Sequence, residues 1–410
     1  MRVAVTGLGV MCASGAHPAD LHQAMIEGRS AVAPRQDAPE LGLQRAVSAL
    51  CPAQFTIDSL PAHQLLDLDR VTLFSLHAGL QAIQAAEAAA PLARERMPVI
   101  WGCSMGGIGT LDEAYIDLLE RRKKRARPMT VPMSMPSAPA FFLAHHLQLL
   151  GPVSTFTAAC ASSALAIGQA ARMIERGEAD AVLCGGGESM VTPAAMRAWQ
   201  MTGALSPTDP VDASRSCRPF DARRNGFAMG EGAGALVLES VASARRRGAP
   251  IHGYVRGFGH TSDIAHISRP SQPSQVAALR AALADADLAP DQIHYLNAHG
   301  TATVLGDLVE AGSIQEAFGA CAERLPVSST KGLHGHTLGG SGAIESIVTL
   351  QALQHRLLPP NAHLEAIDPN LPALNFLRQA TPLPGGTAHA VSNSFAFGGV
   401  NACLVLESSQ

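Results

Sequence analysis

The chain has 410 residues, of which 47% are hydrophobic and 16% charged, and its net charge is −4 at pH 7. This composition excludes intrinsic disorder, which requires low hydrophobicity and high net charge, and it excludes a globally basic nucleic-acid-binding protein. Aromatic residues are few at 4%, whereas glycine occurs 38 times, so we expect helices packed closely on sheets.

Strand and helix patterns alternate along the whole chain. In chain order we expect a strand at 2–6, a helix at 70–90, a strand at 98–101, helices at 112–120 and 161–174, strands at 181–184 and 233–238, a helix at 275–286, a strand at 293–296, helices at 307–318 and 342–355, and strands at 388–391 and 402–406. This alternation predicts an α/β fold with buried sheets.

A boundary near 243–250 divides the chain into 1–245 and 246–410. The second part opens with Tyr-Val-Arg-Gly-Phe-Gly, which is similar to Val-Ala-Val-Thr-Gly-Leu-Gly at the start. A pseudo-duplicated α/β protein is one interpretation of this similarity. The other is coincidence, because a strand followed by a glycine turn is common.

The first residues resemble a strand and a turn rather than a signal peptide, and no stretch resembles a membrane span. None of the eight cysteines forms a C-x-x-C pair, which disfavours a zinc or thioredoxin-like site. We therefore expect a cytoplasmic location with reduced thiols, and no membrane, nucleic-acid or metal partner.

Cys160 lies in Thr-Ala-Ala-Cys-Ala-Ser-Ser, immediately before the helix predicted at 161–174. A thiol at a helix N-terminus is close to the positive end of the helix dipole, which lowers its pKa and favours the nucleophilic thiolate. Its small neighbours would admit a substrate carbonyl. The motif alone favours an ordinary buried cysteine, and the other interpretation is a nucleophile with a lowered pKa.

Two further segments carry candidate catalytic residues. His299 follows the strand predicted at 293–296, and open α/β sheets place ligands at such strand ends. Lys331 and His336 lie in a glycine-rich segment where Glu345 is the natural partner of the lysine. Each residue also has a simpler interpretation, as a histidine bonded to local backbone or as a solvated loop lysine.

Three other patterns have weaker implications. The glycines after Phe397, in Phe395-Ala-Phe-Gly-Gly, could direct a backbone N–H at an oxyanion. Ser104 lies in a G-x-S-x-G pattern after a strand, as in α/β-hydrolases, although Gly107-Ile-Gly109 delays the required helix. The basic run 121–127 is a solvated face or a docking site for a small acidic partner.

Taken together, the motifs resemble the elongating β-ketoacyl-acyl-carrier-protein synthases over essentially the whole chain and in the same order. The matching segments are Val-Thr-Gly-Leu-Gly-Val, Thr-Ala-Ala-Cys-Ala-Ser, Arg-Pro-Phe-Asp, Asn-Gly-Phe-Ala-Met-Gly-Glu-Gly-Ala-Gly, Asn-Ala-His-Gly-Thr, Ser-Thr-Lys-x-x-x-Gly-His and Asn-Ser-Phe-Ala-Phe-Gly-Gly. The resemblance implies a thiolase fold, in which two similar halves form five layers, α-β-α-β-α. The nucleophilic cysteine would belong to the first half, 1–245, and the histidine pair and lysine to the second, 246–410.

The resemblance also implies the activity: decarboxylative Claisen condensation of an acyl-enzyme thioester with malonyl-acyl-carrier protein, in fatty-acid or polyketide/aryl-polyene-type chain elongation. It implies no bound cofactor, because phosphopantetheine on the carrier protein holds the substrates. It further implies a homodimer or a heterodimer with a paralogue such as a chain-length factor. The alternatives are a non-catalytic subunit of such a heterodimer and a serine hydrolase using Ser104.

The resemblance assigns roles to individual residues. Cys160 would hold the acyl group, His299 and His336 would stabilise the enolate, and Lys331 paired with Glu345 would organise the histidines. The N–H groups of Cys160 and Phe397 would form an oxyanion hole, with Phe395 and Phe397 in a gate loop where Ala396 replaces the usual glycine. Some relatives hold a structural monovalent cation at positions that match Asn297, Glu345, Ser392 and Asn393. Residues expected to contact the carrier protein are Arg70, Lys123, Lys124, Arg125 and Arg127.

Overall fold

The computed structural model describes residues 2–35, 40, 42–57, 60–61, 65 and 68–409. Its main sheet has 13 strands, and the strand order contains one pattern twice. In the first half the order is β1-β7-β6-β4-β5, with antiparallel pairs between β1 and β7 and between β7 and β6, and parallel pairs from β6 to β5. These strands are β1 (Val3–Cys12), β4 (Val99–Gly102), β5 (Val153–Phe156), β6 (Ala181–Ser189) and β7 (Met229–Ser240).

The second half repeats this order and these directions as β8-β15-β14-β9-β10. Its strands are β8 (Gly253–Ser262), β9 (Tyr295–Asn297), β10 (Pro326–Ser328), β14 (His389–Phe395) and β15 (Val400–Ser408). The halves join where β1 and β8 pair antiparallel. Shorter strands lie at the margins: β2 (Ala33–Pro34), β3 (Val47–Ala49), β11 (Leu357–Leu358), β12 (Asn375–Phe376) and β13 (Thr381–Pro382).

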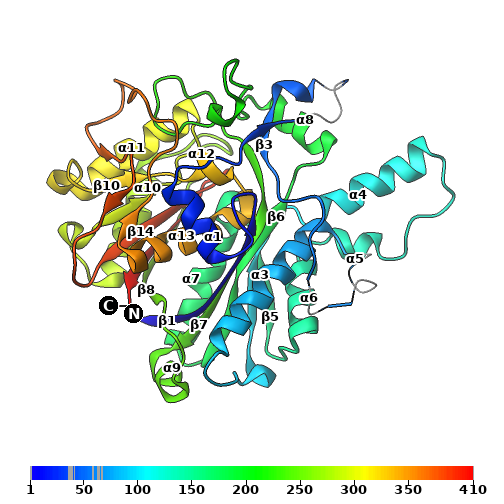
Figure 1. Cartoon of the computed structure of the whole chain (residues 1–410), viewed down its shortest axis with the longest axis horizontal. Helices are drawn as coiled ribbons and strands as arrows, with labels where there is room; N and C mark the ends of the chain where they lie inside the picture. Colours follow the sequence, from blue (N-terminus) through cyan, green and yellow to red (C-terminus); the bar gives the residue numbers. More distant parts are fainter. Residues whose placement is uncertain are drawn as a thin grey trace.

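Helices form three layers around the two halves of the sheet (Figure 1). The central layer is α7 (Ser162–Glu175) and α13 (Ser341–His355), which contact each other and strands of both halves. The outer layers are α3 (Arg70–Ala86) with α6 (Ala138–Leu147) on the first half, and α10 (Gln272–Ala286) with α11 (Val304–Phe318) on the second. The three main hydrophobic clusters occupy these interfaces. The fold is therefore the five-layered α-β-α-β-α arrangement of the thiolases, as predicted.

The other helices connect these layers. They are α1 (Pro18–Ile26), α4 (Ile108–Tyr115), a π-helical turn (Ile116–Glu120), α5 (Thr130–Ser134), α8 (Pro193–Met201), α9 (Val241–Arg247) and α12 (Lys331–His334). The 3-10 turns are Leu43–Arg45, Arg94–Arg96, Ala159–Ala161, Ala213–Arg215, Pro290–Gln292, Gly319–Cys321 and Leu338–Gly340. Within the described ranges, no helix combines the length and apolar character needed to cross a membrane.

The similar glycine segments at the start of the two halves, in β1 and β8, make the same kind of contact with a helix. A Cβ at any of the four glycines would collide with a carbonyl oxygen of the helix that covers the strand. The glycines are Gly7 and Gly9 in β1, under α3, and Gly257 and Gly259 in β8, under α10. Each pair therefore permits a helix to lie directly on its strand, and the pattern is structural rather than a ligand-binding loop.

Most predicted elements are present, with shifted ends. The helix predicted at 70–90 ends at Ala86, and β6 continues through the glycines 185–187 that were expected to follow it. Glycine is needed at these positions of the strand, because neighbouring strands and α7 approach too closely to leave room for side chains. The division at residue 245 stays a prediction, and that residue lies inside α9, between β7 and β8.

Candidate active site

Cys160 lies on a sharp turn between β5 and α7. The 3-10 turn Ala159–Ala161 leads directly into the helix, and Ala159 has φ +44°, a left-handed conformation that non-glycine residues rarely adopt. The hydroxyl of Ser162 stabilises the turn by accepting the N–H of Ala158 at 2.9 Å. The hydrogen bond to Ser162 thus offsets the backbone strain of this turn. The turn holds the thiol at the N-terminal end of α7.

His336 contacts the thiol directly. Its Nε2 lies 3.0 Å from Sγ of Cys160, and its Nδ1 lies 2.9 Å from the hydroxyl of Ser341 at the start of α13. The histidine backbone is fixed to the edge of β7, since its N–H donates to the carbonyl of Ala228 at 2.8 Å. The ring of Phe227 meets the imidazole edge-on, with centroids 5.1 Å apart. Both nitrogens therefore have defined partners.

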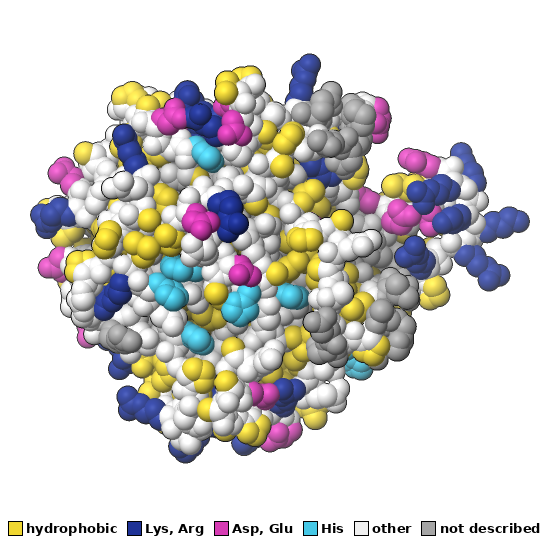
Figure 2. Space-filling model, viewed as in Figure 1, with side chains coloured by type: hydrophobic (Ala, Val, Ile, Leu, Met, Phe, Trp, Pro, Cys, Tyr) yellow, Lys and Arg dark blue, Asp and Glu magenta, His cyan; other side chains and the backbone are white. Residues whose placement is uncertain are grey.

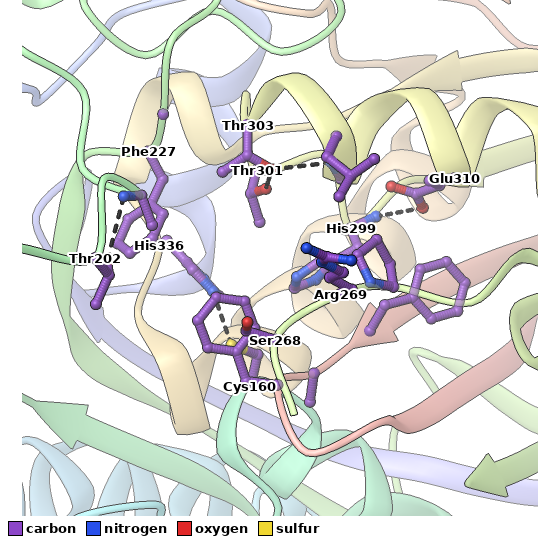
Figure 3. A pocket seen from close by; sticks show the side chains of 18 of the residues that line it. Cys160, Thr202, Phe227, Ser268, Arg269, His299, Thr301, Thr303, Glu310 and His336 are labelled. Atoms are coloured by element: carbon purple, nitrogen blue, oxygen red, sulfur yellow. Dashed lines mark hydrogen bonds between the residues drawn. The ribbon is translucent and has the colours of Figure 1, made fainter. Parts of the chain in front are cut away.

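His299 approaches from the end of β9. Its backbone N–H and that of Gly300 donate to the two carboxylate oxygens of Glu310 in α11, at 2.8 and 2.7 Å. This places its ring 5.3 Å from that of His336, nearly perpendicular to it. Sγ of Cys160 and one nitrogen of each histidine lie within 4.8 Å of one another. Residues far apart in sequence thus form one cluster (Figure 3).

Burial determines the protonation of this cluster. It lowers the pKa of both His299 and His336 well below the ordinary value, and the charge of Lys331 lowers it further, so both imidazoles are neutral. Burial raises the pKa of the Cys160 thiol to about 12, although the charge of Lys331 and the N–H of Phe397 act in the opposite direction. The expected lowered pKa is therefore wrong, because the loss of water around the thiol outweighs the helix terminus.

Lys331 and Glu345 form a fully buried ion pair between α12 and α13, as predicted. Burial raises the pKa of Glu345 to about 7, and Lys331 opposes this rise. Lys331 supplies the positive charge that lowers the pKa of both histidines and of the thiol.

The loop between β14 and β15 covers the thiol. The backbone N–H groups of Phe397 and of Cys160 itself act on the thiol and lower its pKa. The loop turns through Gly398 and Gly399, with φ of +84° and +74°, and closes where the N–H of Ala396 donates to the carbonyl of Val400 at 2.8 Å. Phe397 is 40% exposed at the tip. Both predicted oxyanion donors therefore act on the same thiol, and their role as an oxyanion hole stays a prediction.

Three of the four residues proposed for a cation have buried oxygens without a hydrogen-bond partner among the described residues. They are Oδ1 of Asn297, Oε2 of Glu345 and Oδ1 of Asn393. Carboxylate and amide oxygens suit a hard monovalent cation, which would satisfy these orphaned acceptors. The residues therefore fit such an ion, and its presence stays a prediction.

Ser104 has the wrong partner for a hydrolase nucleophile. Its hydroxyl and its N–H both donate to the carboxylate of Glu188, the latter at 2.8 Å. Helix α4 begins only at Ile108, so the strand-to-helix turn of a nucleophile elbow is missing here.

A cavity of about 310 Å³ opens onto the cluster. Among the predicted residues it is lined by Cys160, His299, His336, Phe395 and Phe397. Lys331 and Glu345 do not line it, so they act from behind the histidines. Sequence reasoning did not single out Thr301, Thr303, Trp199, Phe227, Arg269 and Ser341. The two threonines share a motif with His299, Ser341 shares the glycine-rich segment of Lys331 and His336, and Phe227 lies in a matching segment, whereas Trp199 and Arg269 lie outside every motif.

The predicted carrier-protein contacts lie in two different settings. Arg70 is part-buried and its guanidinium donates to both oxygens of Glu231, at 2.8 and 2.6 Å. The basic run follows α4 on an arm that projects from the body, where Lys and Arg side chains gather (Figures 1 and 2). Within it Lys123 pairs with Asp117 at 2.8 Å. The remaining predicted contacts are exposed and make no ion pair with any described residue; they are Lys124, Arg125 and Arg127.

A thiolase fold that brings a cysteine, two neutral histidines and two backbone N–H donors to one cavity defines a condensing acyltransferase. Residues 1–244 match the family model described as the N-terminal domain of β-ketoacyl synthase, and residues 252–365 match that of its C-terminal domain. The chain belongs to the β-ketoacyl synthase family.

Individual relatives span almost the whole chain. Nodulation protein E of Rhizobium leguminosarum bv. trifolii is 38% identical over 98% of both chains. The 3-oxoacyl-[acyl-carrier-protein] synthase 2 of Synechocystis sp. is 36% identical over 100% of this chain and 98% of that protein. The solved structure of the ishigamide ketosynthase/chain length factor covers 100% of this chain and 99% of its own, with a TM-score of 0.90 and 28% identity.

Proposed function

We propose that this protein condenses an acyl group held on Cys160 with a malonyl thioester, releasing CO₂ and a β-ketoacyl thioester on a carrier protein. The observation that supports this proposal most strongly is the 3.0 Å contact between Sγ of Cys160 and Nε2 of His336, beside two N–H donors in an open cavity. The chemical class agrees with the 36%-identical relative named 3-oxoacyl-[acyl-carrier-protein] synthase 2.

Acyl transfer comes first. The high pKa of the thiol means that it attacks as its proton moves to the neutral Nε2 of His336, rather than as a preformed thiolate. Sulfur bonds to the thioester carbonyl, and the negative oxygen receives hydrogen bonds from the N–H groups of Cys160 and Phe397. The pantetheine sulfur then leaves with the proton, and the acyl group stays on Cys160.

Condensation follows on the acyl-enzyme. The bond from the malonyl carbon to its carboxylate breaks, CO₂ leaves, and the electron pair forms an enolate. Neutral N–H donors from His299 and His336 stabilise the enolate oxygen. The enolate carbon attacks the Cys160 thioester, the carbon–sulfur bond breaks, and the Cys160 thiolate takes up one proton from water. A structural cation, if bound by Asn297, Glu345, Ser392 and Asn393, would neutralise buried negative charge behind the histidines.

The partners follow from this chemistry. The substrates reach the cavity on the phosphopantetheine arm of an acyl-carrier protein, and no bound cofactor takes part. A second ketosynthase subunit, identical or paralogous, fits the edge of the sheet: β5 is the outer strand, and Val153 on it and Phe141 on neighbouring α6 are exposed at 43% and 57%. We place the enzyme in the cytoplasm, where the catalytic thiol stays reduced.

The experiment is intact-protein mass spectrometry after incubation with a panel of acyl-carrier proteins that carry aliphatic or aryl-polyene chains. The wild type is expected to gain one acyl mass, and Cys160→Ala is expected to gain none. Ser104→Ala serves as the matched control and should acylate like the wild type. No adduct with any donor would indicate the non-catalytic subunit of a heterodimer.

A further inference from the structure

Only three charged side chains line the active-site cavity among the described residues: Asp263, Arg269 and Glu310. Glu310 is committed to the protein, because its oxygens accept the N–H groups of His299 and Gly300 and the amide of Asn393. Asp263 accepts the N–H of Ala265 at 2.9 Å within its own loop. Neither carboxylate is paired with Arg269.

Arg269 is the cation of this cavity. Its side chain is exposed and makes no hydrogen bond or ion pair with any residue that the structure describes. In Figure 3 it points into the cavity, toward the side on which His299 lies. Other arginines of this region are paired: Arg224 with Asp368 at 2.6 Å, for example. A guanidinium directed at an open cavity without a protein counter-ion is available to a ligand.

The loop that carries Arg269 is attached to the catalytic loop. The N–H of Gly398 donates to the carbonyl of Ile267 at 2.6 Å, and the N–H of Asp263 donates to the carbonyl of Gly399 at 2.8 Å. These two bonds connect the segment 263–269 to the turn beside Phe397. The backbone that carries Arg269 is therefore held beside the catalytic loop.

Two long helices begin at the same cavity and add positive potential. The first is α10, which follows Arg269 after Pro270 and Ser271, and the second is α11, whose first residues Val304 to Gly306 line the cavity. Each has 15 residues, and the N-terminus of a helix attracts anions. The hydroxyls of Ser268, Thr301 and Thr303 line the same space as further donors.

We propose that Arg269 binds an oxyanion of the thioester substrate. This inference rests on the proposed function, whose substrates carry two such groups: the phosphate of the pantetheine arm and the carboxylate of the malonyl unit. The planar guanidinium can donate to two oxygens of either group at once. Arg269 is thus a substrate-binding residue that recognises a negative charge, carried either by the phosphate of the arm or by the malonyl carboxylate.

The test compares wild type with Arg269→Gln and Arg269→Lys in each half-reaction separately. The probes are acyl and malonyl thioesters of pantetheine and of phosphopantetheine, which differ only in the phosphate. The control is Arg280→Gln, an exposed residue on α10 that faces Glu316 and does not line the cavity.

If the phosphate is the ligand, Arg269→Gln should raise KM roughly tenfold or more for both phosphopantetheine thioesters and leave both pantetheine thioesters unchanged. If the malonyl carboxylate is the ligand, KM should rise by that factor for malonyl thioesters of either arm and stay constant for acyl thioesters. Arg269→Lys should show a smaller rise in KM than Arg269→Gln, because lysine keeps the positive charge but lacks the planar pair of N–H donors of the guanidinium.

Equal KM values for wild type and Arg269→Gln with all four thioesters would overturn the inference. Failure of the proposed function would look different, since the wild type itself would then form no acyl adduct on Cys160 with any donor.

Discussion

The hydroxyl of Ser341 lies 2.9 Å from Nδ1 of His336, while Nε2 of the same ring faces Cys160. A hydroxyl can both donate and accept, so it permits either tautomer of the imidazole. The proposed mechanism uses both tautomers: Nε2 accepts the thiol proton in acylation and presents N–H to the enolate in condensation. Ser341 therefore lets one neutral histidine serve in both steps.

Ser341→Ala should slow both half-reactions, by roughly tenfold if the lost hydrogen bond contributes about 1 to 1.5 kcal/mol. The expected pattern is a lower kcat with an unchanged KM, because the hydroxyl does not contact substrate. Ser346→Ala is the matched control, since its buried hydroxyl donates to the carbonyl of Gly342 within the same helix. A larger KM, or equal losses in the two variants, would contradict this positioning role.

The pH dependence of stability should reveal the buried histidines. Burial lowers the pKa of His334 to about 3 from an ordinary 6.5. Below pH 6.5 the unfolded chain therefore takes up a proton that the folded protein does not, and stability is lost as the pH falls.

For this one residue the loss between pH 7 and pH 5 amounts to about 2 kcal/mol. The variant His334→Gln lacks the titrating imidazole, so this pH-dependent loss of stability is absent from it. The difference in the free energy of unfolding between wild type and variant, measured with urea at several pH values, should thus shrink by about this amount toward pH 5. Parallel pH curves would show that the folded protein protonates His334 normally.

The gate loop should respond to glycine at position 396. Ala396 has a negative φ and its N–H closes the turn with Val400, so alanine fits the observed conformation and restrains it. Ala396→Gly increases the freedom of the loop. We expect a changed preference or turnover across a panel of acyl chain lengths, with Ala390→Gly in the preceding strand β14 as the control for stability alone. Identical kinetics with every chain length would refute a role for this residue.

The basic arm should contribute charge to carrier-protein docking. Replacing Lys124, Arg125 and Arg127 by alanine should raise KM for acyl-carrier protein at low salt, and added salt should remove most of the difference. Pantetheine thioesters, which lack the carrier protein, should be used equally well by wild type and variant. A KM for acyl-carrier protein that is the same in both proteins at every salt concentration would assign the arm another role.

The alternation of apolar patterns predicted an α/β fold, because such patterns report local packing, and the resemblance to the β-ketoacyl synthases supplied its five layers. The glycines of β1 and β8 illustrate this, since their similarity reflects the same contact with α3 and α10. Sequence also singled out Cys160, His299, Lys331 and His336, each inside a glycine- or serine-rich motif.

What sequence could not provide depends on burial and on contacts between distant segments. The thiol pKa was predicted with the wrong sign because the local motif shows the helix terminus but not the loss of solvent. Arg269 lies outside every motif, and Ser341 lies in the glycine-rich segment of His336 without having been singled out. The importance of both arises only where α13 and the loop before α10 meet the catalytic cluster.

The most direct test of the account is the stoichiometry of CO₂ release from labelled malonyl-carrier protein added to enzyme that is already acylated on Cys160. We expect one CO₂ for each β-ketoacyl product, loss of the acyl mass from the enzyme, and strongly reduced release in His299→Ala and His336→Ala. Release of CO₂ without a new carbon–carbon bond, or loss of the acyl group to water, would contradict decarboxylative condensation at this site.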